Sequence, residues 1–374
     1  MRQRIFFKYE KRIRDQSPLD KVFEYFSTQE QDGQEFLTPV DMLRAVVPTY
    51  PPSESTADRS GYLAGEPRSK AVQPNWSKSE ASFFQQFDVD GDGTISYPEF
   101  LLLLTLLSIP GKDVKTIFDV VDLDSNGYLD KSEFMVVVEL LQGMANVHTS
   151  SVGRSKKLLL DGTHAGLFVA FFGKDGSKKL YLPEFRDFLD RLHDELVRLE
   201  FRHYDCNRTG SITALDFGRS LAATADIRNV DRLLDKVDAM VPELARQRLT
   251  LEEFRSVAEM RRNVHTLVVA LEFFRQVGRS LSKDDFSKLL VKLMRVSLSA
   301  KVLDVIFAVF DDGDGALDVP AFLEAMQRRE VMWARRRNPD ADGAPTDALL
   351  RALDRIRSWL PGGSTDLAGF RVPA

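Results

Sequence analysis

A six-residue phrase that recurs along most of the chain is the feature that most constrains its fold. The phrase begins with Ile or Leu, continues through three variable residues, and closes with an acidic residue and Phe. Its copies, the last with Ala in place of the acid, occupy 95–100, 129–134, 180–185, 212–217, 249–254, 281–286 and 317–322. Most copies follow one another at intervals of about 35 residues, which suits a helix–loop–helix unit. A similar phrase at 37–42 is isolated and matches less well.

The segments on both sides of the phrase are predicted to be helices. Apolar residues recur there at three- and four-residue spacing, as in 81–87 upstream and 134–142 downstream. The chain has 26 Phe against 8 Tyr and 3 Trp, and most of the Phe residues belong to this unit. Helix, short acidic loop and helix is the EF-hand arrangement, with a generic helical solenoid as the alternative. We therefore predict an all-α protein with two lobes of paired EF-hands, complete and degenerate, a small N-terminal domain and a C-terminal helix.

The same patterns divide the chain into four segments. A stretch rich in Pro, Ser and Gly at 48–74 favours a linker, and it closes an N-terminal domain at 1–75. A first EF-hand lobe is predicted at 76–190 and a second, mostly degenerate lobe at 191–330. A C-terminal helix and tail are expected at 331–374.

The loop at 88–99 reads DVDGDGTISYPE and has an oxygen ligand at every position that a calcium loop requires. Calcium prefers six to eight oxygen ligands in a flexible cage, and this spacing directs them to one point. The acids at positions 1, 3 and 5, the backbone carbonyl at position 7 and the closing acid belong to Asp88, Asp90, Asp92, Thr94 and Glu99. The sequence therefore predicts a calcium site here.

The loop at 122–133 reads DLDSNGYLDKSE and is equally complete. Its predicted ligands, in order, are Asp122, Asp124, Asn126, Tyr128 through its backbone carbonyl, and Glu133. Because Leu129 follows Ile95 by one repeat, we expect the two complete loops to pair back to back in one lobe.

The loop at 205–216 reads DCNRTGSITALD and leaves metal binding open. Its candidate ligands are Asp205, Asn207, Thr209, Ser211 and Asp216. Because the closing Asp is one methylene shorter than Glu, we expect two-oxygen closure to be harder and Mg²⁺ to compete with calcium. The remaining units lack an acidic ladder and are predicted to be scaffolding. The last loop, at 310–321, reads as a calcium loop that has lost one residue and its closing acid.

Composition and motifs argue against several other classes of protein. The formal charge of −5 lacks the basic excess expected of a nucleic-acid-binding protein. A single cysteine, Cys206, excludes an internal disulfide framework. The longest apolar run, 100–109, is about half of the roughly 20 residues that a membrane span needs. The chain has no phosphate-binding loop, nucleophile elbow or zinc-protease motif, so we do not expect an enzyme.

Two segments, 7–26 and 36–48, are more specific than any EF-hand, and the segment 171–201 continues the same pattern. On these segments almost the whole chain, from residue 6 to about residue 329, resembles the mitochondrial calcium uptake (MICU) family, the EF-hand gatekeepers of the mitochondrial calcium uniporter. The complete loop at 88–99 is similar to the additional hand of the plant and protist members.

This resemblance implies a calcium-sensing regulatory subunit that blocks the uniporter pore at low calcium and releases it when calcium binds. It further implies a location in the mitochondrial intermembrane space, peripheral to the inner membrane. A homodimer, or a heterodimer with a paralogue, is expected as well. By position, the family's contact with the pore subunit falls on Arg14 and Arg44, with Lys21 and Tyr9 as lesser candidates.

The chain departs from the family at three places. Glu24 stands where the animal gatekeeper has a basic residue, the last hand is degraded, and 348–360 lacks the cysteine that links family dimers. We therefore expect no covalent dimer of that kind, and we expect calcium sensing to shift to the first lobe.

Two alternatives remain open from the sequence. The segment 2–14 has six basic residues and one acid, Glu10, which fits a surface for acidic partners or anionic lipid. A solvated helix face or ordinary salt bridges explain the same residues equally well. For the function, the alternative is an EF-hand sensor or buffer that regulates another mitochondrial carrier or a cytosolic enzyme.

Overall fold

The computed structural model describes residues 2–54 without Asp32, 94–134 without Ser108, Pro110 and Leu123, 165–276 without Lys174, and 281–335. Most of these residues are helical and the strands are two or three residues long, in agreement with the predicted all-α fold. Within these ranges, no helix combines the length and the apolar character needed to cross a membrane.

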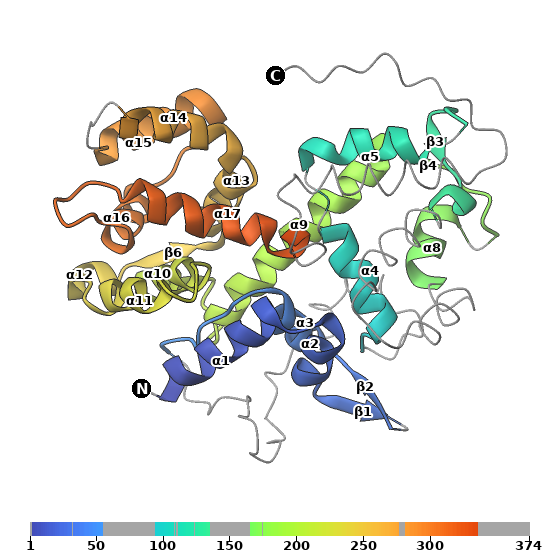
Figure 1. Ribbon diagram of the computed structural model, residues 1–374, viewed down its shortest axis with the longest axis horizontal. Helices are drawn as coiled ribbons and strands as arrows, with labels where there is room; N and C mark the ends of the chain where they lie inside the picture. Colours follow the sequence, from blue (N-terminus) through green and yellow to red (C-terminus); the bar gives the residue numbers. More distant parts are fainter. Residues whose placement is uncertain are drawn as a thin grey trace.

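The described elements fall into two halves that lie side by side (Figure 1). Those of the N-terminal half are α1 (Arg2–Gln16), α2 (Leu19–Phe26), β1 (Gln29–Gln31), β2 (Gln34–Phe36), α3 (Pro39–Val46), α4 (Tyr97–Leu107), the short 3₁₀ helix η2 (Gly111–Asp113), α5 (Val114–Val121), β3 (Tyr128–Leu129), α8 (Ala165–Phe172), β4 (Leu180–Tyr181) and α9 (Leu182–Tyr204). Those of the C-terminal half are β5 (Ser211–Thr213), α10 (Ala214–Ala223), α11 (Val230–Asp238), α12 (Pro242–Ala245), β6 (Arg248–Thr250), α13 (Leu251–Arg262), α14 (Val264–Gln276), α15 (Lys283–Met294), α16 (Ala300–Val309) and α17 (Val319–Arg335).

The repeated phrase builds the start of a helix whether or not a metal binds. Its second residue caps the helix and its acid lies three residues later, which is the spacing of a capping box. At α13, for example, Thr250 Oγ1 accepts from the Glu253 backbone N–H, and Glu253 Oε2 accepts from the Thr250 N–H at 2.9 Å. The Phe that follows, Phe254, is buried in the core. The phrase therefore persists in units that have no calcium ligands.

The leading aliphatic residue of each phrase pairs with the same residue of another unit. Leu129 of β3 pairs with Leu180 of β4, and Ile212 of β5 pairs with Leu249 of β6, both antiparallel. Leu37 forms an antiparallel bridge with Ile95. In the last two units, the Leu317 N–H donates to the Leu281 carbonyl oxygen at 3.4 Å. The chain thus has eight units that pair in chain order, two by two.

This pairing corrects the expectation that Ile95 and Leu129 come together. The weak phrase at 37–42 is a true unit, and it takes Ile95 as its partner across the predicted domain boundary at residue 75. Units pair in succession along the chain. The unit at 37–42 therefore takes the one at 95–100 as its partner, and the unit at 129–134 pairs with the next one, at 180–185. Each complete loop is consequently paired with a unit that lacks the calcium ligands.

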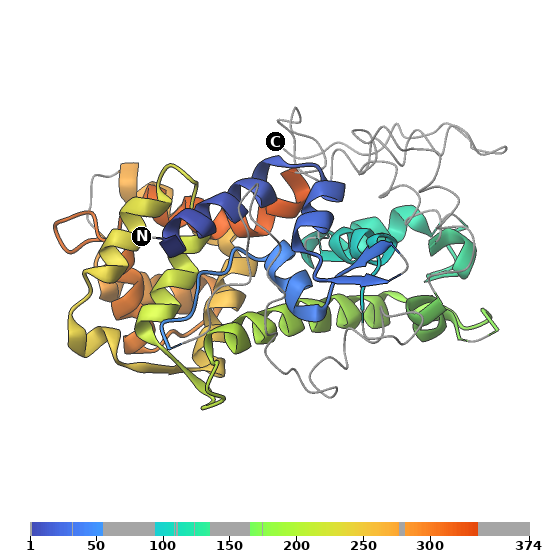
Figure 2. The same cartoon turned by 90° about the horizontal axis from the view of Figure 1, so that it is seen from below.

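Two clusters of buried apolar side chains lie under these pairs. A first core takes residues from α2, α3, α4, α5, α8 and the first part of α9. A second core takes residues from the end of α9 and from α10 to α17, together with Phe7 and Tyr50 from the N-terminal half. The 23-residue helix α9 crosses from one core to the other, as the view in Figure 2 shows along its length. It therefore connects the two halves as one continuous element.

Helix α1 is the second connection between the halves, beginning beside α11 and ending beside α3 (Figures 1 and 2). Arg4 pairs with Asp235 at 2.6 Å and with Asp238 at 2.8 Å, and Lys8 pairs with Asp231 at 2.6 Å. The basic stripe of α1 thus faces an acidic stripe of α11 within the same molecule. For Arg4 and Lys8, the explanation by ordinary salt bridges therefore applies, rather than a surface for acidic partners or anionic lipid.

Candidate calcium loops and a buried charge cluster

The loop at 122–133 has the backbone of a calcium loop. Asp122, at position 1, accepts from the Asn126 N–H at 2.9 Å and from the Gly127 N–H at 2.8 Å. Gly127 has a φ of 84°, which a side chain at this turn would oppose. At the other end, Glu133 accepts from the Asp130 N–H at 3.0 Å, while Asp130 accepts from the Glu133 N–H at 2.9 Å. These bonds hold both ends of the loop in position around its centre.

The carboxylates of this loop converge. One oxygen each from Asp122, Asp124 and Glu133 lie within 4.8 Å of one another. Asp122 and Glu133 are buried, each 8% exposed, whereas Asp124 is exposed. Three carboxylates so close together repel one another unless a cation lies between them, and hard oxygen donors in this number suit calcium. The residues present therefore fit a calcium ion.

The predicted neutral ligands of this loop lie in the same turn. Asn126 Nδ2 donates to Asp124 Oδ2 at 2.7 Å, and Asn126 Oδ1 accepts from the Tyr128 N–H at 3.0 Å. Asp130, at position 9, accepts a hydrogen bond from the Ser132 hydroxyl, which lowers the pKa of the Asp130 carboxyl. This hydrogen bond favours the ionised form of Asp130.

The first loop is described only in its closing half. Asp88, Asp90 and Asp92 lie outside the described residues, and Thr94 and Glu99 lie within them. Glu99 is 7% exposed, and its Oε2 accepts from the backbone N–H and the hydroxyl of Ser96, both at 2.7 Å. The closing acid is thus in the same place relative to its helix as Glu133.

The third loop has the same turn but different closing partners. Asp205 accepts from the Thr209 and Gly210 N–H groups, each at 2.8 Å, as Asp122 does from its own loop. Asp216, at the closing position, is fully buried and accepts two hydrogen bonds from Ser53, which lies far away in sequence. Asn207 Nδ2 lies 3.4 Å from Glu54 Oε2. The candidate ligands of this loop are therefore brought together with residues that no local pattern indicated.

The last loop is a shortened turn. Asp311 Oδ1 accepts from the Gly313 and Gly315 N–H groups at 3.1 and 2.9 Å, and Asp311 forms a bridge with Leu317. Phe310, the first residue of the predicted loop at 310–321, is completely buried in the second core.

Arg14 and Arg44, predicted to contact a pore subunit, lie inside the protein. They are 0% and 8% exposed. Arg44 Nη2 donates to Glu10 Oε1 at 2.8 Å, Arg14 Nη1 lies 3.5 Å from Glu10 Oε2, and Arg14 Nη1 donates to the Arg44 carbonyl oxygen at 2.9 Å. Both guanidinium groups lie over the ring of Phe26, at 5.3 and 5.6 Å from its centroid. In this conformation they hold α1 against α3.

The two lesser candidates are nearer the surface. Lys21, on α2, is exposed, and Tyr9 is half-buried with its ring 5.8 Å from that of Tyr25. The sequence prediction missed the importance of Glu10, which is 0% exposed and joins the two arginines. Its position as the only acid of the basic segment, four residues before Arg14, was the available signal.

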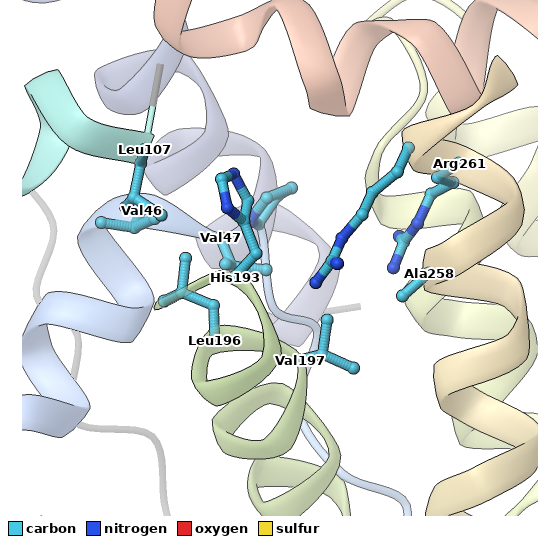
Figure 3. A pocket seen from close by; sticks show the side chains of 10 residues that line it. Val46, Val47, Leu107, His193, Leu196, Val197, Ala258 and Arg261 are labelled. Atoms are coloured by element: carbon cyan, nitrogen blue, oxygen red, sulfur yellow. The ribbon is translucent and has the colours of Figure 1, made fainter. Parts of the chain in front are cut away.

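A small cavity of about 60 Å³ lies where the two halves meet. His193 of α9 lies on one side and Arg261 of α13 on the other, with Val46, Leu107 and Ala258 also in its lining (Figure 3). The His193 ring is fixed by a contact of Nδ1 with the Leu189 carbonyl oxygen at 2.8 Å. This volume is far below the roughly 300–1,000 Å³ of small-molecule sites, so the cavity does not suit a substrate.

Comparison with known proteins places the chain among relatives of known name. The EF-hand domain pair family matches residues 77–139 and again 278–329. "Calcium uptake protein, mitochondrial" from Arabidopsis thaliana is 41% identical over 340 residues, covering 88% of this chain and 67% of the relative. "Calcium uptake protein 1, mitochondrial" from Homo sapiens is 29% identical over 349 residues, covering 88% of this chain and 70% of the relative.

Solved structures agree with this fold. The apo structure of the mitochondrial calcium uniporter protein MICU2 superposes with a TM-score of 0.59 at 24% identity, covering 91% of this chain and 96% of that one. The calcium-binding state of EFHA2 superposes with a TM-score of 0.56 at 26% identity, covering 80% and 95%. Paired EF-hands throughout and extensive identity to the Arabidopsis protein lead to one conclusion: the chain belongs to the mitochondrial calcium uptake protein (MICU) family.

Proposed function

We propose that the chain is a calcium-sensing regulatory subunit of the mitochondrial calcium uniporter, which blocks the pore at low calcium and releases it when calcium binds. The observation that carries the proposal is the convergence of Asp122, Asp124 and Glu133 in a chain of this family. Calcium-sensor loops of this kind typically bind at about 10⁻⁷–10⁻⁵ M.

The two complete loops are proposed to act on different parts of the molecule. The loop at 122–133 is paired with the unit that begins α9, and α9 crosses to the second core. The loop at 88–99 is paired with the unit that begins α3, which carries Arg44. Calcium binding changes the angle between the helices that flank such loops. Calcium in the first loop would therefore act on α3, and calcium in the second loop would act on α9.

The partner is proposed to be the uniporter pore subunit, met in the intermembrane space at the inner membrane. Contact by Arg14 or Arg44 would require the cluster around Glu10 to open, so Lys21 and Tyr9 are assigned to the contact in this conformation. A homodimer or a heterodimer with a paralogue, and a peripheral contact with the membrane, complete the proposal. The role is regulatory and not enzymatic.

Mitochondrial calcium uptake in cells that lack the protein tests this function. Uptake is measured at resting and at raised calcium, with the wild-type chain, the Glu99→Gln/Glu133→Gln variant or Lys21→Glu returned to the cells. We expect loss of the protein and Lys21→Glu to raise uptake at resting calcium, and the loop variant to keep uptake blocked when calcium rises. Resting uptake that is unaffected by loss of the protein would favour a sensor of another carrier or enzyme.

A further inference from the structure

In the third loop, a charged side chain contacts two of the oxygens that would bind the cation of a calcium loop. Arg248, from the paired strand β6, donates through Nη2 to Thr209 Oγ1 and to the Ser211 carbonyl oxygen, both at 2.8 Å. These two oxygens occupy positions 5 and 7 of the loop, both of which are calcium-ligand positions. Arg248 Nε also donates to Ser211 Oγ at 3.0 Å. A guanidinium group, with five donors in one plane and a permanent charge, satisfies several ligand oxygens at once.

The closing acid of this loop is held by a segment from the other half of the chain. The backbone N–H of Ser53 donates to Asp216 Oδ1 at 2.8 Å, and its hydroxyl donates to Asp216 Oδ2 at 2.7 Å. Both carboxylate oxygens, which would close a calcium site together, therefore accept from Ser53. Asp216 is 0% exposed, whereas Ser53 is exposed, so these hydrogen bonds join a buried carboxylate to a residue at the surface.

Ser53 belongs to a strap, residues 49–54, that lies along the third loop and the end of α9. The Tyr50 N–H donates to Tyr204 Oη at 3.1 Å, and the Tyr50 carbonyl oxygen lies 3.0 Å from His203 Nε2. Glu54 accepts from Arg248 Nη1 at 2.6 Å. The strap thus supplies both a donor for the closing acid and a carboxylate for the guanidinium group.

We propose that the third loop is a metal-independent clamp, in which Arg248 replaces the cation and the strap completes the closure. The charges support this assignment. The two complete loops each have four acids, whereas the third has two, Asp205 and Asp216, so one fixed positive charge suits it better than a doubly charged ion. The clamp fixes the N-terminal half to the C-terminal half at any calcium concentration. The inference does not depend on the partner named above.

In the last loop, cationic side chains from α11 also contact oxygens of the loop. Lys236 of α11 donates to the Asp311 carbonyl oxygen, and Arg232 of the same helix lies 3.3 Å from Asp318 Oδ2. Cationic side chains from neighbouring elements therefore contact both the third loop and the last loop.

Cys206 provides a direct measurement, because it is the only cysteine, lies at position 2 of the third loop and is exposed. The rate of its reaction with a neutral disulfide reagent is measured in the Glu99→Gln/Glu133→Gln background, which silences the first two loops. We expect neither 1 mM calcium nor 1 mM magnesium to change the rate by more than about twofold. Adding Arg248→Gln and Ser53→Ala should raise it at least about fivefold. The exposed Arg246, two residues away, gives the control Arg246→Gln, which should leave the rate unchanged.

Two results would overturn the proposal. One is a metal-dependent rate in the background protein that Asp205→Asn abolishes, because the loop would then bind the ion itself. The other is an unchanged rate in the Arg248→Gln/Ser53→Ala variant, because these residues would then not hold the loop. If that variant does not fold, calorimetry on otherwise wild-type protein decides: Asp205→Asn should bind as many calcium ions as the wild type, and the loss of one ion would refute the clamp.

Discussion

Leu37 and Ile95 form a reciprocal bridge, in which the Leu37 N–H donates to the Ile95 carbonyl oxygen at 2.9 Å and the Ile95 N–H donates back at 2.7 Å. The bridge attaches the first complete loop to the unit that begins α3. Both side chains are buried in the first core, at 0% and 1% exposure. The closing half of the loop at 88–99 is therefore in direct contact with the N-terminal region.

The closing acids should determine how many calcium ions bind. We expect Glu133→Gln to remove one of the two ions detected by calorimetry, because the amide cannot supply two anionic oxygens. Calcium at about 100 times its dissociation constant stabilises the folded state by about 2.7 kcal/mol per site, so the variant should also lose that increment in calcium-dependent stability.

Glu184 offers the matched control for this change. It closes the unit that pairs with the second loop, but it is exposed and lies 3.4 Å from Lys178. Glu184→Gln should leave the number of bound ions unchanged. A full complement of ions in Glu133→Gln would remove the second loop from the list of calcium sites.

The pairing of units can be tested by truncating the bridge residues. Leu37→Ala should destabilise the protein by about 2–5 kcal/mol and weaken calcium binding in the first loop only, because only that loop is bridged to it. Leu180→Ala should weaken the second loop only. Each variant is titrated with calcium in a background where the other complete loop is silenced. A Leu37→Ala variant that weakens the second loop as strongly as the first would indicate that the two complete loops pair with each other.

The buried cluster around Glu10 should contribute strongly to stability. Glu10→Gln removes the carboxylate that contacts the guanidinium groups of Arg14 and Arg44, and breaking a buried pair in this way typically costs about 3–5 kcal/mol. The measurement is the free energy of unfolding in urea. The exposed Glu24 supplies the control, for which Glu24→Gln should change that free energy by less than about 0.5 kcal/mol. Equal effects of the two changes would contradict the buried ion-pair assignment.

Lys11 should make stability depend on pH in the alkaline range. Burial lowers its pKa to about 8 from the ordinary value of 10.5, while Asp15 and Asp226 act to raise it and Arg14 and Arg328 to lower it. Between these two pH values the unfolded chain holds a proton that the folded protein has lost. The free energy of unfolding should therefore increase with pH across that window, by ~3 kcal/mol at most.

Lys11→Met removes the titrating group and is the comparison for this measurement. Urea unfolding of both proteins at pH 7, 9 and 10 gives the difference between them. We expect the wild type to gain stability relative to Lys11→Met as the pH rises. A constant difference over that range would show that Lys11 has the same pKa in the folded and unfolded states.

Much of the fold was readable because its signals are local. The repeated phrase specifies a cap, an acid and a core Phe within six residues, so each helix start follows from sequence alone, as at Thr250 and Glu253. The turn of a calcium loop is equally local, which is why Asp122 and Gly127 lie as expected. The phrase at 37–42 could not be recognised as a paired unit from its spacing, because a long insertion separates it from the next phrase at 95–100.

By itself, the sequence determined the EF-hand repeat, the two complete loops and the family. The tertiary structure decided which units pair, that Arg14 and Arg44 are buried beside Glu10, and that Ser53 and Arg248 meet at the third loop. The physical reason is the separation along the sequence between the residues that interact. A cap or a ligand turn is made by residues a few positions apart. The bridge between Leu37 and Ile95, the ion pair between Glu10 and Arg44, and the hydrogen bond from Ser53 to Asp216 join residues tens to hundreds of positions apart. Only the packed chain brings them together.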